Sequence, residues 1–578
     1  MRAVQSRVSR AIRHLPAVVA LALLAGCDAR PGADLVLEGG RIYTVNAQSD
    51  WAEALAVRDG VIVAVGDRAA VSELIGDKTE VIDLQGRLVL PGIIDQHAHP
   101  FYAGEEPLFQ CRVAFDASFD ELLSAVAQCS RETAEDDWIV GSAWGSHLIE
   151  TLSTGEALES LDAVSAGRPV IFRDDTAHNV WANSRVLELA GIDASTEDPD
   201  RGVIVKDPQT GTPTGLLLET AAKLAQRAIP PRSAEDDAAA AAYGAKTLNS
   251  FGVTSFLDAA VPPRIAAAYA RLDKEGRLTA RVGLAFSDGL LTVHAPESLS
   301  EIVAGREAFA SENVLTDYVK LFLDGVPTSW TSAFLKPYLP TEAYGADFHG
   351  ETHYSQERLN ELVTAFDAQG LTIKIHAAGD ASLRMALDAV EAARAANGGG
   401  GKVHQIAHAG YIHGDDLPRF AELRVVADAS PILWFPTPIL TVIENTLGAE
   451  RANRWWPFRE LTDSGAIVAA GSDWPAATPI PDPWTGLEAL VSRRDPDGRL
   501  AGALWPEQAL SLEEAVRVYT INGAIAMNIN AETGSLEVGK SADFIILDRN
   551  IFTVPVDDIS ETAVLSTFFR GALVHGGE

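Results

Sequence analysis

Apolar runs with the character of strands alternate with amphipathic helical stretches through most of the chain. Helical patterns such as residues 357–369 and 382–396 lie between several of the apolar runs. Strands that alternate with helices favour an α/β fold with a parallel sheet, and eight such strands close a (β/α)8 TIM-like barrel. The predicted strands are residues 88–94, 253–258, 281–287, 318–324, 371–376, 403–408, 425–429 and 466–473.

Strand-like runs also lie at both ends of the chain. Turn signals such as Asp59-Gly60 separate them. The β unit of residues 35–87 is too small to be stable alone, so we expect it to pair with residues 531–578. The runs are residues 35–45, 54–65 and 80–83 near the start and 542–547 and 567–574 near the end.

The barrel is expected to span residues 88–530 and to contain one large insertion. The connection after its first strand, about residues 101–233, is far too long for a barrel crossover. Long insertions of this kind commonly act as lids or specificity elements. In this lobe the pattern predicts strands at 138–140 and 169–173 and a helix at 184–190.

The composition is that of a soluble globular protein with an acidic surface. Apolar residues make up 47% of the 578 positions, charged residues make up 22%, and the net charge is −34. The first 26 residues hold four of the 46 basic residues and no acidic ones, which leaves 42 basic against 80 acidic residues, or −38. Such a chain is not expected to bind nucleic acid or anionic lipid head groups.

Residues 1–26 have the pattern of a bacterial lipoprotein signal peptide. Four arginines precede an apolar stretch, 16–25, that is too short to span a bilayer as a mature helix. The stretch leads into Cys27, the expected lipidated residue and the start of a tether, 27–34; an ordinary secretory signal is the alternative. Asp28 resembles an inner-membrane retention signal. We therefore expect an exported protein, anchored by acyl chains at the periplasmic face of a membrane.

Two further cysteines, Cys111 and Cys129, lie in the exported part. An oxidising compartment permits a disulfide between them. Two free thiols are the alternative, because the sequence does not give their distance in space.

Candidate metal ligands stand at or near the carboxyl ends of the predicted strands. His97 and His99 follow the first strand and are two residues apart, a spacing that places both on one face of a strand. The carboxyl ends of barrel strands converge on one face, where active sites form, so distant residues would meet there. The candidates on the fourth, fifth, sixth and eighth strands are Lys320, His376, His408 and Asp473.

These residue types favour metal-dependent hydrolysis. Imidazole and carboxylate ligands suit zinc and similar divalent ions, and a catalytic metal activates the water that it binds. Asp473 could ligate the metal, orient the water and carry its proton to a leaving group. The metal would repel an ammonium at Lys320, so we expect Lys320 either to be carboxylated by carbon dioxide or to point away.

Several motifs in the chain are typical of one known family. They include Pro91-Gly-Ile-Ile-Asp-Gln-His-Ala-His99, Val319-Lys-Leu-Phe-Leu-Asp-Gly325, Ile375-His-Ala-Ala-Gly-Asp380, His404-Gln-Ile-Ala-His408 and Gly471-Ser-Asp-Trp-Pro475. From about residue 35 to its end, the chain resembles the amidohydrolase superfamily, in the family 3 branch that includes N-substituted formamide deformylases. The resemblance implies a barrel with a composite β-sandwich from both termini, and hydrolysis of C–N bonds. It also implies one or two divalent metal ions, usually zinc, held by His97, His99, Lys320 as a carbamate, His376, His408 and Asp473.

One segment departs from the family pattern. The family usually has Arg and Glu inside the His404 segment, where this chain has Gln405 and Ala407. By alternation these residues face away from the His408 side, so we expect altered packing or contacts around the ligands rather than loss of the metal.

Three further residues are candidates for substrate contact. His178 lies in the inserted lobe beside Trp181 and Asn183, where a capping and packing cluster is the alternative. Trp144 could line a pocket or pack in a core. Asp324 shares the face of Lys320 by alternation and could hold a ligand in place.

The sequence thus predicts a metal-dependent hydrolase that cleaves C–N bonds of an amide-like small molecule, with Asp473 as proton shuttle. The alternatives are ester or lactone hydrolysis at the same site, or a metal-containing binding lipoprotein without turnover. The complete set of ligand positions argues against the binding protein. The partners compatible with the sequence are a small-molecule substrate, a membrane reached through the lipid anchor only, and a second copy of the chain in a homodimer.

Overall fold

The computed structural model describes residues 32–577, apart from residues 115, 135–136, 175–178, 201, 288–297, 342–343 and 477. Its centre is the predicted eight-stranded parallel sheet, nearly closed into a barrel, with the strands adjacent in chain order. The strands are β8 (Ile93–Ala98), β14 (Val253–Val261), β15 (Arg281–Phe286), β16 (Val314–Phe322), β17 (Thr372–His376), β18 (His404–Ala407), β19 (Val425–Ala429) and β20 (Ile467–Ala470).

The first barrel strand differs from the predicted one. Leu88–Pro91 form a separate strand, β7, which pairs with β2 (Arg41–Tyr43) and β21 (Phe544–Leu547) outside the barrel. Gly92 lies between β7 and β8, and glycine is needed there because a Cβ would clash with the side chain of Thr254 in β14. Both stretches are apolar and buried, so their hydrophobic pattern does not reveal the change of sheet. His97 therefore lies inside β8, and His99 directly follows it.

Backbone hydrogen bonds join the last strand to the first. Asp473 N donates to His97 O and His99 N donates to Trp474 O, each at a distance of 2.7 Å. Gly471 permits this approach, because a Cβ there would clash with the Cβ and backbone of His97. The segment after β20 is thus held directly against β8.

Helices cover the outside of the barrel, and their sequences explain which faces are buried. In α12 (Asp380–Asn397) apolar residues recur at helical spacing on the buried face, among them Leu383, Leu387 and Val390. Ser355 caps α11 (Gln356–Ala368) by accepting a hydrogen bond from Arg358 N. The other helices around the barrel are α2 (Pro100–Phe109), α8 (Ala234–Ser250), α9 (Pro263–Lys274), α10 (Leu299–Ala304), α13 (Leu417–Leu423), α14 (Pro438–Leu447), α15 (Ala449–Ala452), α16 (Phe458–Asp463), α17 (Pro483–Ser492), α18 (Leu512–Val518) and α19 (Ile521–Ala526).

The two ends of the chain build a β-sandwich together, as the resemblance implies. A four-stranded sheet packs against a six-stranded sheet that takes strands from both ends, and Leu37, Val89 and Phe544 lie in their shared core. Asp59 and Gly60 have φ values of 51° and 75°, which a two-residue hairpin turn with positive φ at both positions requires. The further strands are β1 (Leu35–Glu38), β3 (Trp51–Ala52), β4 (Ala54–Arg58), β5 (Val61–Gly66), β6 (Glu80–Asp83), β22 (Val564–Phe569) and β23 (Ala572–Gly576).

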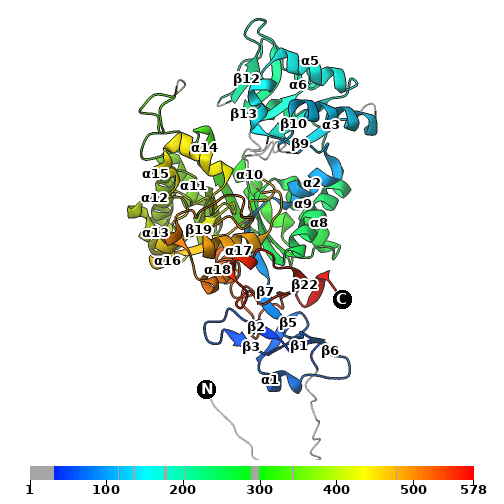
Figure 1. Cartoon of the computed structure of the whole chain (residues 1–578), viewed down its shortest axis with the longest axis vertical. Coiled ribbons are helices and arrows are strands. Elements are labelled where there is room, and N and C mark those ends of the chain that lie inside the picture. Colours follow the sequence, from blue (N-terminus) through cyan, green and yellow to red (C-terminus); the bar gives the residue numbers. More distant parts are fainter. Residues whose placement is uncertain are drawn as a thin grey trace, which may run out of the picture.

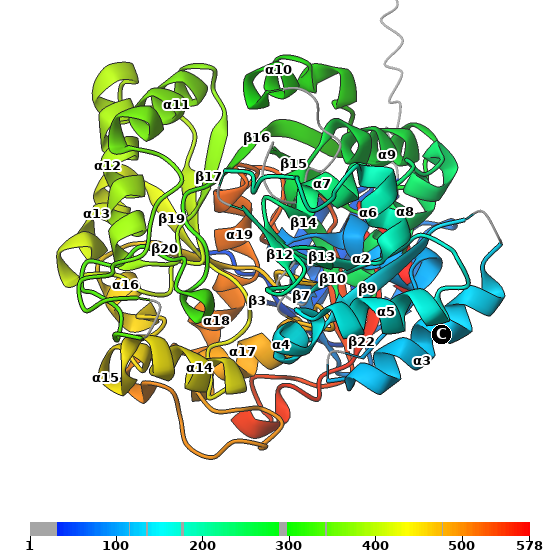
Figure 2. The ribbon, with the colours of Figure 1, turned by 90° about the horizontal axis from the view of Figure 1, so that it is seen from above.

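The inserted lobe has its own five-stranded mixed sheet. It lies at the end of the molecule opposite the sandwich, over the side of the barrel that carries α2 and α8 (Figures 1 and 2). Cys111 and Cys129 form a disulfide in this lobe. Its elements are β9 (Ile139–Trp144), β10 (Val170–Asp174), β11 (Val180–Ala182), β12 (Gly202–Lys206), β13 (Pro213–Glu219), α3 (Phe119–Glu132), α4 (Ile149–Leu152), α5 (Gly155–Val164), α6 (Ser184–Ala190) and α7 (Ala222–Gln226).

The membrane anchor expected from the sequence lies outside the described part of the chain. Cys27 and Asp28 belong to residues 1–31, so the lipoprotein signal stays a prediction. Among the described residues, no helix is both long and apolar enough to cross a membrane.

Candidate metal centre

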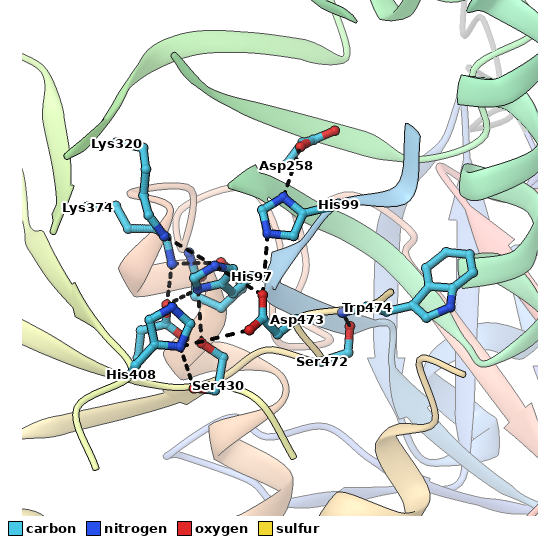
Figure 3. A network of polar contacts seen from close by, with 12 residues as sticks. His97, His99, Asp258, Lys320, Lys374, His408, Ser430, Ser472, Asp473 and Trp474 are labelled. Atoms are coloured by element: carbon cyan, nitrogen blue, oxygen red, sulfur yellow. Dashed lines mark hydrogen bonds and ion pairs between the residues drawn. The ribbon is translucent and has the colours of Figure 1, made fainter. Parts of the chain in front are cut away.

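Predicted ligands from four barrel strands come together at one mouth of the barrel (Figure 3). His97, His408 and Asp473 each present a ligand atom within 4.8 Å of the other two. Asp473 Oδ1 lies 3.5 Å from His97 Nε2 and 3.3 Å from His99 Nε2. The ring centroid of His376 lies 4.4 Å from that of His408. The carboxylate of Asp473 is therefore surrounded by imidazoles from the first and sixth strands, and the fifth strand adds another beside them.

The backbone turns two of these side chains towards the others. His408 directly follows β18 and Asp473 lies three residues beyond β20, and each has a φ of 58°. Residues other than glycine rarely adopt positive φ, and those that do cluster at functional sites. For Asp473 the conformation is fixed by the hydrogen bond from its backbone N to His97 O.

Each of the four histidines has an oxygen atom near one of its ring nitrogens. His97 Nδ1 donates to Asp428 Oδ2 at 2.8 Å, and His408 Nδ1 donates to the backbone O of Ser430 at 2.8 Å. His376 Nε2 donates to the backbone O of Gly325 at 3.0 Å, and His99 Nδ1 lies 3.9 Å from Asp258 Oδ1. For His97, His376 and His408 the hydrogen-bonded acceptor fixes the tautomer and directs the other nitrogen towards a metal, whereas His99 Nδ1 has no hydrogen-bond partner among the described residues.

His97 and His408 favour the neutral form, which is the form that binds metal. Burial lowers the pKa of His97 well below its ordinary value, and the nearby Lys320 and Lys374 lower it further. Burial also lowers the pKa of His408, and the neighbouring His376 and His97 add to the effect.

Lys320 points towards the cluster and not away from it. Its Nζ lies 3.3 Å from His97 Nε2, and the side chain is buried. Burial, followed by the nearby charge of Lys374, lowers the pKa of Lys320 to about 7. A neutral amine is therefore accessible near neutral pH, and only the neutral amine reacts with carbon dioxide.

These residues fit a divalent metal ion. The donors are imidazole nitrogens and a carboxylate oxygen, which suit zinc and similar divalent ions, and His97, His376 and His408 carry the oxygen partners found around metal ligands. A carboxylated Lys320 would add an anionic donor beside His97. Of the six predicted ligands, His97, His408 and Asp473 are the three whose ligand atoms lie within 4.8 Å of one another, and His99, Lys320 and His376 lie beside them.

Lys374 and Asp428 were not predicted, although both lie beside the site. Lys374 is paired in register with Lys320 on the adjacent strand, and its Nζ is hydrogen-bonded to Asp428 Oδ2. Both side chains are completely buried. The sequence did contain a signal for these two residues, a charged residue inside an apolar strand. Such a residue needs a partner of opposite charge when it is buried.

Asp95 and Ser472 are a second pair that sequence reasoning missed. Ser472 Oγ donates to Asp95 Oδ2 at 2.6 Å, and His97 N donates to Asp95 Oδ1 at 3.1 Å. This pair ties the first strand to the segment that carries Asp473.

Asp324 holds the loops around His376. It accepts hydrogen bonds from three backbone N–H groups and from Ser382 Oγ, and its Oδ1 lies 3.7 Å from His376 Nε2. Burial raises the pKa of Asp324 to about 6, against the opposing effect of these hydrogen bonds. With both oxygens engaged, Asp324 is placed to support His376.

The other residues expected to contact substrate lie in the inserted lobe. Trp144 is fully buried in the hydrophobic core of the lobe. Of the two roles considered for it, lining a pocket or packing in a core, the structure shows packing in a core. His178 falls in residues 175–178, outside the described residues. Its neighbour Asn183 caps α6 by accepting from Val186 N, and Trp181 is buried in the same core as Trp144.

Gln405 and Ala407, which depart from the family pattern, are both buried in β18. Gln405 Oε1 accepts from Gln96 Nε2 at 3.2 Å across the barrel, and Gln405 Nε2 donates to Ala526 O. Ala407 is paired in register with His376 and Asp428. The alternation of β18 does not extend to His408, which follows the strand and has a φ of 58°.

A parallel barrel with histidines and an aspartate at its mouth, joined to a sandwich from both termini, defines a metal-dependent hydrolase. The chain belongs to the amidohydrolase family, whose model matches residues 80–575. It is 30% identical to Protein LONG AFTER FAR-RED 3 of Arabidopsis thaliana, over 93% of this chain and 91% of that protein. It is 29% identical to the N-substituted formamide deformylase of Arthrobacter pascens, over 93% and 98% of the two chains. A solved structure, an uncharacterized metal-dependent hydrolase from Pyrococcus horikoshii OT3, is similar with a TM-score of 0.72 and 25% identity, over 90% and 99% of the chains.

Proposed function

We propose that this metal-dependent hydrolase cleaves the C–N bond of an amide-like small molecule, with Asp473 as the proton shuttle. The observation that carries the proposal is the position of Asp473, whose carboxylate contacts the imidazoles of His97 and His99 and lies 3.9 Å from His408 Nδ1. The similarity to an N-substituted formamide deformylase supports an amide-like substrate.

One or two divalent metal ions, with zinc as the first candidate, would be held by the six predicted ligands. When bound, the metal would polarise the substrate carbonyl and make an attacking water more acidic. Lys320, as a carbamate, would supply a further anionic ligand.

Asp473 would move the proton that the reaction displaces. The water oxygen forms a bond to the carbonyl carbon and gives one proton to Asp473. The C–N bond then breaks, and Asp473 returns that proton to the departing nitrogen. The backbone hydrogen bond from Asp473 N to His97 O would keep the residue that carries the carboxylate in place for both transfers.

The proposal is tested with a panel of N-formyl and N-acyl amines and their matched esters and lactones. Each substrate is offered to native protein, to chelated protein and to chelated protein reloaded with zinc. We expect amide turnover that falls to background on chelation and returns with zinc. Turnover of esters alone would show that the enzyme cleaves an ester bond and not the proposed C–N bond. Activity that survives complete metal removal would overturn the mechanism.

We propose that the enzyme acts outside the cytoplasm, held to a membrane by a lipid on Cys27. The signal-like residues 1–26 support this, and so does the Cys111–Cys129 disulfide, since disulfides persist in oxidising compartments. We expect Cys27→Ser to move the full-length protein from the membrane fraction to the soluble fraction, while Cys111→Ser leaves it in the membrane fraction. An unchanged membrane fraction for Cys27→Ser would contradict the lipid anchor.

A further inference from the structure

We infer that the buried Lys374–Asp428 ion pair is a positioning device for His97, which fixes the ring nitrogen offered to the metal and thereby sets metal affinity. The inference rests on the proposed metal-dependent function. It assigns a role to two residues that are not among the six predicted ligands.

Asp428 is bound to its two partners through a single oxygen. Oδ2 accepts from His97 Nδ1 at 2.8 Å and from Lys374 Nζ, and Oδ1 has no hydrogen-bond partner among the described residues. All three side chains are at most 1% exposed. A carboxylate in such a place requires a cation, and Lys374 supplies it.

The contact with Asp428 determines which nitrogen of His97 carries the proton. A carboxylate only accepts, so Nδ1 must be the protonated nitrogen and Nε2 must carry the lone pair. Nε2 is the atom that lies 3.3 Å from Lys320 Nζ and 3.5 Å from Asp473 Oδ1. The pair therefore directs the metal-binding lone pair of His97 towards the other predicted ligands.

Lys374 also holds the backbone that carries His97. Its Nζ donates to Gln96 O at 3.0 Å, directly before His97 in β8. One ammonium thus fixes both the strand and, through Asp428, the ring. Ser430 Oγ lies 2.9 Å from His97 Nδ1 and adds a further contact on the same side of the ring.

The two neighbouring lysines have separate tasks. Lys320 and Lys374 are register partners on adjacent strands, and Figure 3 shows them side by side. Lys320 Nζ approaches Nε2 of His97, whereas Lys374 Nζ approaches the carboxylate bound to Nδ1. Lys374 therefore acts on the metal through His97 and is a positioning residue rather than a ligand.

The barrel offers a matched control, a second buried carboxylate that binds a histidine and a cationic side chain but lies away from the mouth. Asp367 Oδ1 accepts from His404 Nε2 and from Arg394 Nη1, each at 2.9 Å, and both His404 and Asp367 are buried. If Asp428 had a purely structural role, Asp428→Asn and Asp367→Asn would have the same effect on metal affinity. If Asp428 positions His97, only Asp428→Asn weakens metal binding.

The test measures the binding of cobalt(II) and zinc to metal-depleted full-length protein by calorimetry, together with the visible spectrum of the cobalt form. We expect Asp428→Asn to weaken metal binding by about 10- to 100-fold and to alter the cobalt spectrum. We expect Asp367→Asn to lower the melting temperature while leaving affinity and spectrum as in the native protein. If circular dichroism shows that Asp428→Asn is unfolded, Lys374→Gln carries the test, with metal binding weakened at least about tenfold.

Equal metal affinity and equal spectra for the native protein and a folded Asp428→Asn or Lys374→Gln would overturn the inference. Loss of affinity in Asp367→Asn as large as in Asp428→Asn would also overturn it, because general destabilisation would then explain both. If the native protein bound no divalent metal, the proposed function itself would fail, which is a different result.

Discussion

Replacing Asp473 with Asn should lower kcat by about 10³-fold in a protein that remains folded. Asn has nearly the same size and can still accept hydrogen bonds, but it cannot take a proton from water and return it to the leaving nitrogen. Positioned proton transfer contributes roughly 10²- to 10⁴-fold, and the middle of this range corresponds to about 4 kcal/mol of activation free energy. The measurement is kcat and kcat/KM on the best amide of the panel, with metal content determined on the same samples.

Metal content distinguishes the two ways in which this variant can lose activity. Asp473 is also a predicted ligand, so the proposal requires the loss of kcat to persist when the variant is saturated with zinc. Asp463→Asn, an exposed position in α16, serves as the matched control and should keep native kinetics. A zinc-saturated Asp473→Asn enzyme within about tenfold of native kcat would show that another group moves the proton.

The fold was predictable because its strands are apolar runs between amphipathic helices. Seven of the eight barrel strands coincide with predicted ones and the first is shifted, and the composite sandwich was expected both from the strand-like runs at the two chain ends and from the family resemblance. The predicted strand 88–94 merged β7 with the start of β8. Leu88 to Ile94 is one apolar stretch, and the strands that draw its two halves into different sheets, β2 and β21 for β7 and β14 for β8, are distant in sequence.

The ligands at strand ends were predictable from fold geometry, whereas the residues that orient them were not. Histidines at strand ends stand out because the barrel brings those ends together. Asp428 and Lys374 lie within predicted strands, and their role depends on which residues are neighbours across the barrel. The positive φ of His408 and Asp473 depends on tertiary contacts such as Asp473 N to His97 O, which local sequence does not encode.

Replacing Lys320 with Met should remove both the carbamate and most of the bound metal. Met keeps the length and apolar stem of the side chain, so packing in the buried strand is preserved while the amine is lost. Without the carbamate, the cluster loses the anion proposed to lie beside His97 Nε2. We expect kcat to fall by at least about 10²-fold, the scale on which loss of one preorganised charged group acts.

The carbamate is measured directly by loading metal-depleted protein with zinc in ¹³C-bicarbonate and recording the ¹³C spectrum. The native protein should show one carbamate signal, and Lys320→Met should show none. Lys402→Met, which replaces a partly exposed lysine outside the mouth, should keep the signal, the metal and the activity. A Lys320→Met protein with native metal content and activity would leave Lys320 without a role as ligand, and the site would then depend on its four histidines and Asp473 alone.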